Sequence, residues 1–336
     1  MRPRQTSDRQ FVTFVQRWQC GTSVRKAGLA CLMSLFALLA NSPAAIAEQN
    51  KKTNPDRTDQ FVVFNAMLYE NMPAFGDKLP VVYEHTIFKH GVLKDGIRPS
   101  EKSVAHAANW VSETAAEAKR QNRTPLVALD IERWHLWPFV PMPEHKIALG
   151  HYADSASRFK DAVESPICLY GVLPVGGIIT ALKAARNPET QQQWVAANKA
   201  AAAAISGTVS ALCPALYAYY QYPNDPNDER ALKQWLANAR EVVRQARLLA
   251  PDKPIYPFIW PQYHSGGNVR GFGFLSEQRW QAQLEFLKSH TDGLILWGGY
   301  DLVANHPLAW DDNASWWRTL KRVFPEQTHV RPSARK

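Results

Sequence analysis

The chain lacks several patterns that would assign it quickly to a large class of proteins. Its four cysteines and its histidines do not stand at metal-ligand spacings, so we expect no metal site and no cofactor. No glycine-rich loop of the nucleotide-binding kind follows the first expected strand, and no Gly-x-Ser-x-Gly sequence marks a nucleophilic serine. No dense stripe of Lys and Arg is present, which argues against nucleic acid as a partner. The chemistry must therefore be carried by other residues.

Long apolar runs are also missing, except for one near the N-terminus. The run Ala27–Leu39 follows two basic residues and precedes the small-residue pattern Ala45-Ile46-Ala47, an arrangement typical of a cleaved export signal. Asn41, Ser42 and Pro43 interrupt the run before it reaches the roughly 18 residues that a membrane span needs. We therefore predict that residues 1–47 are a signal peptide. The mature protein would be periplasmic or secreted, without stable membrane insertion; a retained anchor is the competing interpretation.

The rest of the chain is only mildly basic. Residues 1–47 contain six Lys or Arg and one Asp, so their removal lowers the net charge by five, from +9 to +4. This balance weakly favours an acidic polymer as the partner. We expect a disordered polar linker at 48–59, a single large domain at 60–325 and a basic tail at 326–336.

Two cysteines remain in the expected mature chain, Cys168 and Cys213. Each lies in an apolar stretch that we expect to be a strand. Export permits a disulfide between them, whereas burial suits a free thiol equally well. The sequence leaves both possibilities open because it does not give the distance between the two residues.

Apolar strand-like runs alternate with helical patterns along the whole expected domain. The strands are expected at 61–66, 81–85, 126–131, 167–173, 211–218, 255–260 and 293–297. The helices are expected near 101–120, 147–163, 189–206, 228–246, 276–289 and 312–322. This alternation predicts an α/β fold with parallel strands, and so many units in one chain favour a single-domain (β/α) TIM-like barrel of seven or eight strands.

Two carboxylates end the strand-like run in Leu126–Trp134. Side chains alternate along a strand, so Asp130 and Glu132 would point the same way with Cα atoms about 6.5 Å apart. Like charges so close cannot ionise independently, and partial desolvation would keep one proton on the pair near neutral pH. Such pairs cleave glycosidic bonds. The competing interpretation is that helix N-termini or arginines satisfy both carboxylates.

Polar and aromatic side chains gather where the expected strands end. In a barrel these ends meet at one mouth, which is where active sites lie. The residues concerned are Asn65, Glu84, Asp130, Glu132, Tyr217, Tyr220, Trp260, Gln262, Trp297 and Asp301. Sugar rings stack on aromatic faces; the rings that could serve are Trp134, Trp137, Tyr220, Tyr222, Trp260, Tyr263, Trp297 and Tyr300. For each ring taken alone, core packing is the competing explanation.

Several separate segments resemble the hyaluronidase glycoside hydrolases of animals and insect venoms. Phe64–Ala66 is similar to that family's first strand, and Ala128–Trp134 to its catalytic Asp-x-Glu strand. Ala211–Tyr217 is similar to its Ala-Leu-Tyr-Pro-Ser-Ile-Tyr strand, and Leu294–Gly298 to its closing Val-Ile-Trp-Gly strand. The resemblance spans about Phe61 to Gly298, and the Asp-x-Glu and Trp-Gly segments are its most specific parts.

The resemblance implies a distorted barrel that cuts β-linked polymers containing N-acetylhexosamine, with the substrate's own acetamido oxygen as the nucleophile. By position, Glu132 would be the general acid and base, Asp130 would orient the acetamido group, and Tyr217 would hydrogen-bond to it. Trp297 would form the wall against the acetamido methyl group. The chain departs from the family at Leu173–Gly177, where the resemblance gives no counterpart for a second tyrosine.

We therefore predict an exported, retaining glycoside hydrolase whose substrate is a polysaccharide containing N-acetylhexosamine. The catalytic residues would be Glu132, Asp130 and Tyr217, and the substrate-binding residues Trp297, Asn65, Trp134, Tyr220, Trp260, Asp301 and Glu84. One alternative is a non-catalytic polysaccharide-binding barrel. Another keeps hydrolysis but uses a protein nucleophile, for which Glu84 and Asp301 are the candidates.

Overall fold

A computed structural model describes residues 61–93, 98–120, 126–139, 142–163, 165–222, 225, 228–268, 273–301 and 306–329. The expected signal peptide and linker lie outside the described residues, as does the tail beyond residue 329. Contacts divide the chain into two units, one of residues 1–58 with 301–306 and one of residues 59–300 with 307–336. The fold described below is that of the larger unit.

Its strands form two parallel sheets, in the orders β2-β1-β7-β6 and β3-β4-β5. The strands are β1 (Val62–Met67), β2 (Asp77–Lys78), β3 (Val81–Tyr83), β4 (Val127–Asp130), β5 (Ile167–Leu169), β6 (Phe258–Ile259) and β7 (Gly293–Gly298). Their side chains are almost all buried, as expected for parallel strands that helices cover on the outside.

The two sheets are joined on both sides by backbone pairing. On one side β2 and β3 belong to the continuous stretch 77–83, which pairs with β1 through its first half and with β4 through its second. On the other side the segment 211–218 bridges β5 and β6; its pairs are Cys213 with Tyr170, Leu212 with Ile255 and Ala215 with Phe258. Each of seven parallel segments thus pairs with two neighbours, which confirms the α/β barrel and gives it seven strands.

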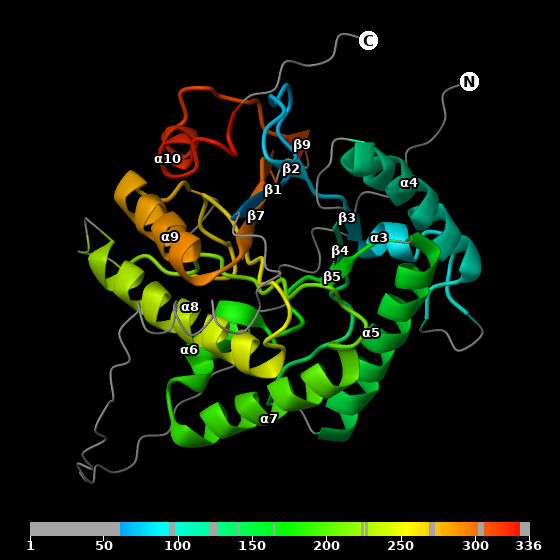
Figure 1. The fold of residues 1–336 in the computed structure, drawn as a ribbon. Coiled ribbons are helices and arrows are strands. Elements are labelled where there is room, and N and C mark those ends of the chain that lie inside the picture. The colour runs from blue at the N-terminus through cyan, green and yellow to red at the C-terminus, as the bar shows by residue number, and fades with distance from the viewer. Residues whose placement is uncertain are drawn as a thin grey trace, which may run out of the picture. The chain divides into compact units, whose positions relative to one another are not determined.

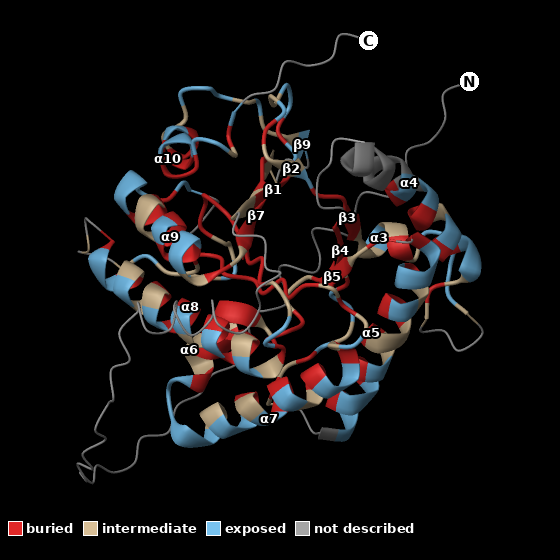
Figure 2. Cartoon of the chain, in the orientation of Figure 1, coloured by how far each residue is buried: buried red, intermediate tan, exposed pale blue. Residues whose placement is uncertain are grey.

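Eight described helices connect these segments, and Figure 1 shows that they lie outside the strands. They are α3 (Glu84–Ile87), α4 (Glu101–Arg120), α5 (Met142–Val163), α6 (Gly177–Ala184), α7 (Pro188–Ile205), α8 (Glu229–Leu249), α9 (Glu277–His290) and α10 (Ser315–Val323). Their inner faces are buried and their outer faces exposed (Figure 2). None of the described helices is long and apolar enough to cross a membrane.

Two helices, α7 and α9, begin where capping residues predict. Asn187 accepts a hydrogen bond from the Thr190 backbone N–H at 2.8 Å, and Pro188 takes the first position of α7, where its missing N–H costs nothing. Ser276 likewise accepts from the Arg279 N–H at the start of α9. These signals explain why the expected boundaries of both helices lie within one residue of the observed ones.

The sequence predicted some strands to be longer than they are. The stretches 211–218 and 255–260 contain isolated bridges and the two-residue strand β6 in place of full ladders. Pro214 and Pro257 interrupt these stretches, because proline has no N–H to donate to a ladder. Helix α6 was not predicted; it begins at Gly177 directly after Gly176, and both glycines have φ in the left-handed region. Short strands β8 (Tyr300–Asp301) and β9 (His306–Pro307), which pair with each other, were not predicted either.

The open question about the two cysteines is answered by the fold. Cys168 on β5 and Cys213 on the neighbouring segment form a disulfide, with Cα atoms 6.1 Å apart. Both residues are fully buried. The bond crosslinks two adjacent barrel strands close to the ends that carry polar side chains.

Candidate active site

The predicted acid pair lies at the carboxyl end of β4, where Tyr83 at the end of β3 pairs with Asp130. The strand ends at Asp130, so strand alternation does not place Glu132. The following turn is fixed by Tyr152 on α5, whose hydroxyl donates to the carbonyl of buried Ile131 at 2.6 Å. The same hydroxyl lies 3.1 Å from the carbonyl of Trp134. Helix α5 thus holds the loop that carries Glu132.

Both acids have raised pKa values. Burial raises the pKa of Asp130 well above its ordinary value, and the nearby charges of Glu132 and Glu84 raise it further. Burial, and then Glu84, also raise the pKa of Glu132, although its side chain keeps contact with solvent. Neither carboxyl forms an ion pair with any residue that the structure describes, and the buried Oδ1 of Asp130 has no partner among them.

This arrangement refines the expected location of the proton. The sequence predicted that proximity to Asp130 keeps a proton on Glu132. In the structure Asp130 is the more enclosed of the two, and its pKa is raised well above the ordinary range. Burial and the neighbouring carboxylates therefore favour the protonated form of Asp130, while the solvent-exposed Glu132 is the group that can exchange protons with a substrate or water.

Glu84 is a third carboxylate beside the pair, and its two oxygens are occupied. Oε2 accepts the backbone N–H of Glu132 at 3.0 Å, and Oε1 accepts Nε of Arg133 at 2.9 Å. The Arg133 guanidinium in turn lies 3.4 Å from the centre of the Phe88 ring. Glu84 thus holds the loop after β4 in place, and its predicted contact with substrate stays a prediction.

Two tyrosines lie beside the acids, Tyr217 buried and Tyr170 partly buried. Tyr217 lies near the end of the segment 211–218, and its ring centre is 6.1 Å from that of Tyr170, which directly follows β5. Burial raises the pKa of both hydroxyls, and the charge of Asp130 raises them further. Sequence reasoning missed Tyr170; the expectation that the family's second tyrosine near the acetamido group has no counterpart stays a prediction. The available signal was a tyrosine immediately after an apolar strand.

Trp297 near the end of β7 is fixed by contacts on two sides. Its Nε1 donates to the Tyr83 hydroxyl at 3.0 Å, and its ring centre lies 5.9 Å from that of Tyr217. The ring of Trp260 meets that of Trp297 edge-on, with ring centres 4.7 Å apart, but Trp260 is only 1% exposed. It therefore packs against Trp297 without reaching the surface. At Gly298 an added Cβ would lie 2.4 Å from Nε1 of Trp260, so only glycine fits there.

Two other predicted substrate-binding residues make internal contacts. Asn65 is buried, and its Oδ1 accepts the Met67 backbone N–H at 3.0 Å. Trp134 is half-buried and meets the Tyr152 ring at 5.1 Å. These contacts account for both residues by packing and local hydrogen bonding, and their predicted roles in binding remain untested.

The predicted residue Asp301 is half-buried in β8 and belongs to the smaller unit of the chain. Its predicted contact with substrate, and its candidacy as a nucleophile, therefore remain predictions.

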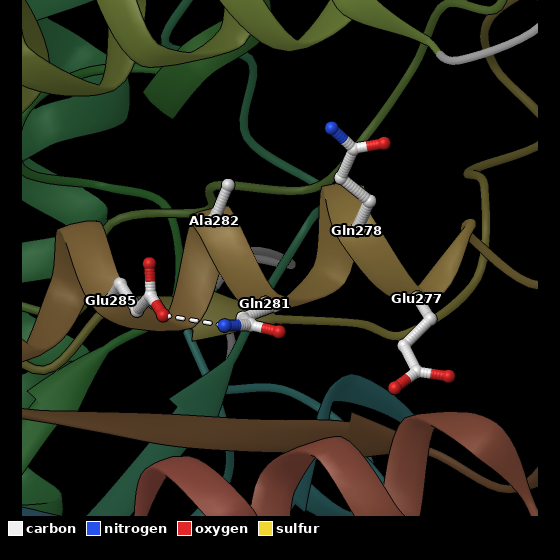
Figure 3. A pocket seen from close by; sticks show the side chains of 5 residues that line it. All are labelled: Glu277, Gln278, Gln281, Ala282 and Glu285. Atoms are coloured by element: carbon white, nitrogen blue, oxygen red, sulfur yellow. Dashed lines mark hydrogen bonds between the residues drawn. The ribbon is translucent and has the colours of Figure 1, made fainter.

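A surface hollow of about 480 Å³ lies on α9, away from the strand ends (Figure 3). It is lined by Glu277, Gln278, Gln281, Ala282 and Glu285. Arg322 of α10 already binds Glu277 at 3.0 Å and Gln281 at 2.8 Å. Gln281 also donates to Glu285 at 2.7 Å. Among the residues that line the hollow, the acids thus bond to neighbouring side chains, unlike the pair after β4.

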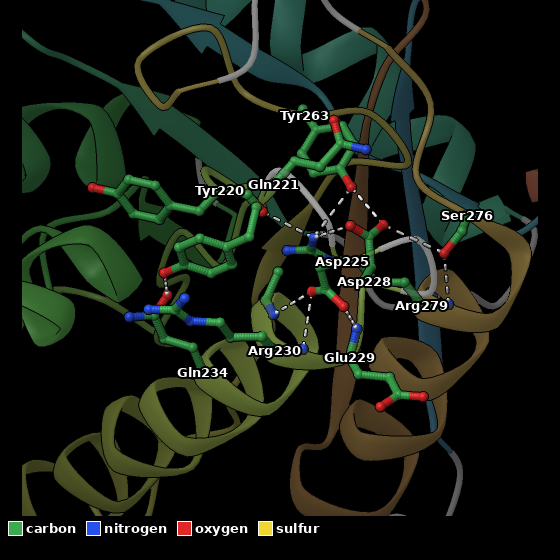
Figure 4. A network of polar contacts seen from close by, with 12 residues as sticks. Tyr220, Gln221, Asp225, Asp228, Glu229, Arg230, Gln234, Tyr263, Ser276 and Arg279 are labelled. Atoms are coloured by element: carbon green, nitrogen blue, oxygen red, sulfur yellow. Dashed lines mark hydrogen bonds and ion pairs between the residues drawn. The ribbon is translucent and has the colours of Figure 1, made fainter.

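A buried ionic network supports another part of the mouth (Figure 4). Asp228 precedes α8 and accepts a 2.6 Å hydrogen bond from the Tyr263 hydroxyl. Arg279 on α9 lies 3.7 Å from Asp228 and donates to the carbonyl of Tyr220 at 3.0 Å. The half-exposed Tyr220, predicted to bind substrate, is thus positioned through its backbone.

Neither a protein-family model nor a curated protein sequence matches the chain. Among solved structures, the catalytic domain of the GH26 endo-β-1,4-mannanase from Bacillus sp. JAMB-750 is similar to this chain, with 12% sequence identity and a TM-score of 0.42. The match covers 85% of this chain and 89% of the mannanase domain. A GH18 chitinase from Pseudoalteromonas aurantia has 12% identity and a TM-score of 0.36, with coverages of 66% and 68%. A D-allulose 3-epimerase from Methylomonas sp. has 15% identity and a TM-score of 0.35, with coverages of 74% and 82%. At such scores these likenesses carry no argument about substrate or mechanism.

Among the described residues, no group of three or more His, Cys, Asp or Glu side chains is placed to hold a metal ion. The chemistry that these residues offer at the mouth is that of two proton-sharing carboxyls, two tyrosine hydroxyls and a tryptophan wall. Such a set can donate and accept protons beside a neutral, polar substrate.

Proposed function

We propose that the protein is an exported glycoside hydrolase of the hyaluronidase type, which cleaves a polysaccharide containing N-acetylhexosamine with retention of configuration. One observation carries the proposal: Asp130 and Glu132 lie together at a strand end with raised pKa values, and no cation among the described residues pairs with them. A structural carboxylate pair is normally paired with arginine or capped by N–H groups. An unpaired one is costly to fold and is typical of general acid and base chemistry.

In the first step the substrate's acetamido oxygen attacks the anomeric carbon while Glu132 donates its proton to the leaving glycosidic oxygen. The proton reaches Glu132 from the pair. As positive charge develops on the acetamido group beside Asp130, the ionised form of Asp130 is stabilised, so its proton is released towards Glu132. The products of this step are the shortened chain and a cyclic oxazolinium ion.

In the second step water attacks the same carbon and opens the ring, and Glu132 takes the proton of that water. Two inversions at one carbon give net retention. The raised pKa of Glu132 serves both steps, because a group that titrates closer to neutral pH can give up and regain a proton within one cycle.

The surroundings of the pair support this assignment. The rings of Tyr217 and Tyr170 lie 6.1 Å apart, and the charge of Asp130 raises the pKa of both hydroxyls. Tyr217 would donate to the acetamido oxygen. Trp297, held by Tyr83, would cover the acetamido methyl group. The neutral hydroxyls stay protonated at physiological pH because burial raises their pKa, so they remain hydrogen-bond donors.

Export to the periplasm or beyond is supported by the buried disulfide between Cys168 and Cys213, because such bonds persist in oxidising compartments. The alternative of a non-catalytic polysaccharide-binding barrel rests on the departure from the family at Leu173–Gly177; the raised pKa values of the two acids favour catalysis instead. The alternative of Glu84 as nucleophile is disfavoured because both of its oxygens already accept hydrogen bonds.

The test compares N-acetylated polymers, such as hyaluronan, chondroitin and chitin oligosaccharides, with a de-N-acetylated chitosan of the same length. We expect release of reducing ends only from an acetylated polymer, with the product first appearing as the retained anomer in proton NMR. Glu132→Gln should abolish release, whereas Glu285→Gln on the outer face of α9 should leave it unchanged. Equal cleavage of the de-N-acetylated chain would reject the acetamido mechanism, and binding without any cleavage would favour the non-catalytic barrel.

A further inference from the structure

A histidine outside the predicted set lies at the same mouth. His264 follows the sixth strand segment, and its backbone N–H donates to the carbonyl of Ala218 at 2.8 Å. This bond places it beside the strand end that carries Tyr217. Its imidazole stacks on the Tyr217 ring with centres 5.7 Å apart and planes 15° apart, and it meets the Tyr219 ring at 4.7 Å.

The tautomer of this imidazole is fixed by its own loop. The backbone N–H of Gly266 donates to Nδ1 of His264 at 2.9 Å, so Nδ1 must carry a lone pair. A neutral ring then carries its hydrogen on Nε2. Residue 266 is a glycine at a close approach, since an added Cβ would lie 3.0 Å from Nδ1.

The ring is also kept neutral. Burial among aromatic side chains lowers the pKa of His264 to about 4, because an imidazolium would lose its hydration there. The groups that face it are Tyr217, Tyr219 and Trp260, and none of these carries a positive or negative charge near neutral pH. Over the range from about pH 5 to 8 the ring therefore presents the same Nε2–H group.

No residue that the structure describes accepts a hydrogen bond from the Nε2–H group of His264. The side chain is half-buried, and this nitrogen is not sealed from solvent. A packing histidine in a core normally has both nitrogens satisfied or enclosed. Here one nitrogen is locked by the backbone while the other remains accessible beside Tyr217.

We propose that His264 is a substrate-binding residue whose Nε2–H donates a hydrogen bond to a hydroxyl or ring oxygen of the sugar that carries the acetamido group at Tyr217. The inference rests on the proposed function, because it assumes that a glycan occupies this mouth. A fixed neutral donor suits an uncharged sugar oxygen and adds specificity, since the hydrogen bond is lost if the oxygen is absent or misplaced.

Three substitutions separate the donor from the packing. His264→Asn keeps an acceptor near the Nδ1 position for Gly266 but removes the Nε2 donor, His264→Phe keeps the ring alone, and His264→Gln can place an amide N–H near the Nε2 position. Binding is measured by calorimetry in the Glu132→Gln background, so that the ligand is not consumed. The probes are a chitin tetrasaccharide and a hyaluronan hexasaccharide, and the tighter ligand is carried forward.

We expect Kd to rise about three- to tenfold in the Asn and Phe variants, as for loss of one neutral hydrogen bond, and to stay within about twofold in the Gln variant. His106→Asn on α4 is the matched control and should leave Kd unchanged. Binding that is equal in all His264 variants would overturn the inference and leave the proposed function intact. Absence of binding to the parent protein would overturn both.

Nitrogen-15 NMR gives a readout that does not depend on activity. We expect the His264 ring to show the Nε2–H tautomer without titration between about pH 5 and 8, and its Nε2 resonance to move when the oligosaccharide is added. A ring that carries its proton on Nδ1, titrates near its ordinary pKa, or keeps its Nε2 resonance in place when ligand is bound would refute the assignment.

Discussion

Glu84→Gln tests the electrostatics of the site with little change in shape. Glutamine is isosteric with glutamate, and its amide oxygen can still accept the Glu132 N–H that Glu84 now accepts at 3.0 Å. What disappears is one negative charge, which raises the pKa of both Asp130 and Glu132. Both pKa values should therefore fall in the variant, and the carboxyls should lose their protons at lower pH.

The size of this fall in pKa follows from Coulomb's law. For carboxyl groups about 6 Å apart at an effective dielectric constant of about 40, the repulsion is about 1.4 kcal/mol, which corresponds to a tenfold change in the acid dissociation constant. The high dielectric constant is appropriate because the Glu84 side chain is 31% exposed and Glu132 keeps contact with solvent. Added salt should weaken the repulsion further.

The assay is the pH dependence of kcat/KM for the best polymer from the panel, at low and high ionic strength. The alkaline limb reports loss of the general acid's proton, so in Glu84→Gln it should move to a pH that is lower by about 0.5 to 1. Glu84→Ala, which loses the hydrogen bonds as well, should reduce kcat at every pH. An alkaline limb that stays in place, or moves upward, in Glu84→Gln would show that Glu84 does not set the pKa of the acid.

Three further predictions concern stability. Because the folded-state pKa of Asp130 is raised, the native state binds more protons than the unfolded chain and loses stability as pH rises above the ordinary Asp range. Asp130→Asn should therefore stabilise the protein by about 1 kcal/mol or more at pH 8 and hardly change its stability at pH 4. Equal changes in the free energy of urea unfolding at the two pH values would contradict this prediction. Replacing Cys168 and Cys213, 45 positions apart in the chain, by serine should cost about 4 kcal/mol, so an unchanged urea midpoint under non-reducing conditions would argue against the bond. Arg279→Met should lower the free energy of unfolding by about 3 to 5 kcal/mol, because it leaves Asp228 unpaired. Adding Asp228→Asn should recover part of this loss. Strictly additive effects of the two substitutions would contradict the network.

The barrel could be predicted from sequence because its signals are local. Helices α4 and α7 are rich in alanine, a strong helix former, and their expected ranges agree with the structure to within a residue. Strand lengths were harder, because prolines remove ladder hydrogen bonds without breaking the extended path of the chain. The pairing of stretch 77–83 with two different neighbours depends on contacts between distant segments, which no local pattern contains.

The chemical content of the site can be read directly from the chain: two carboxyls one residue apart after an apolar strand, and aromatic residues where other strands end. Which of these groups act together depends on the folded arrangement. Folding brings Glu84, 48 positions before Glu132, onto the backbone of that residue, and Tyr170 onto Tyr217. It also decides which of the two carboxyls is more enclosed and has its pKa raised more strongly, because desolvation depends on what surrounds each carboxyl in space, and neighbours in space are not neighbours in the chain.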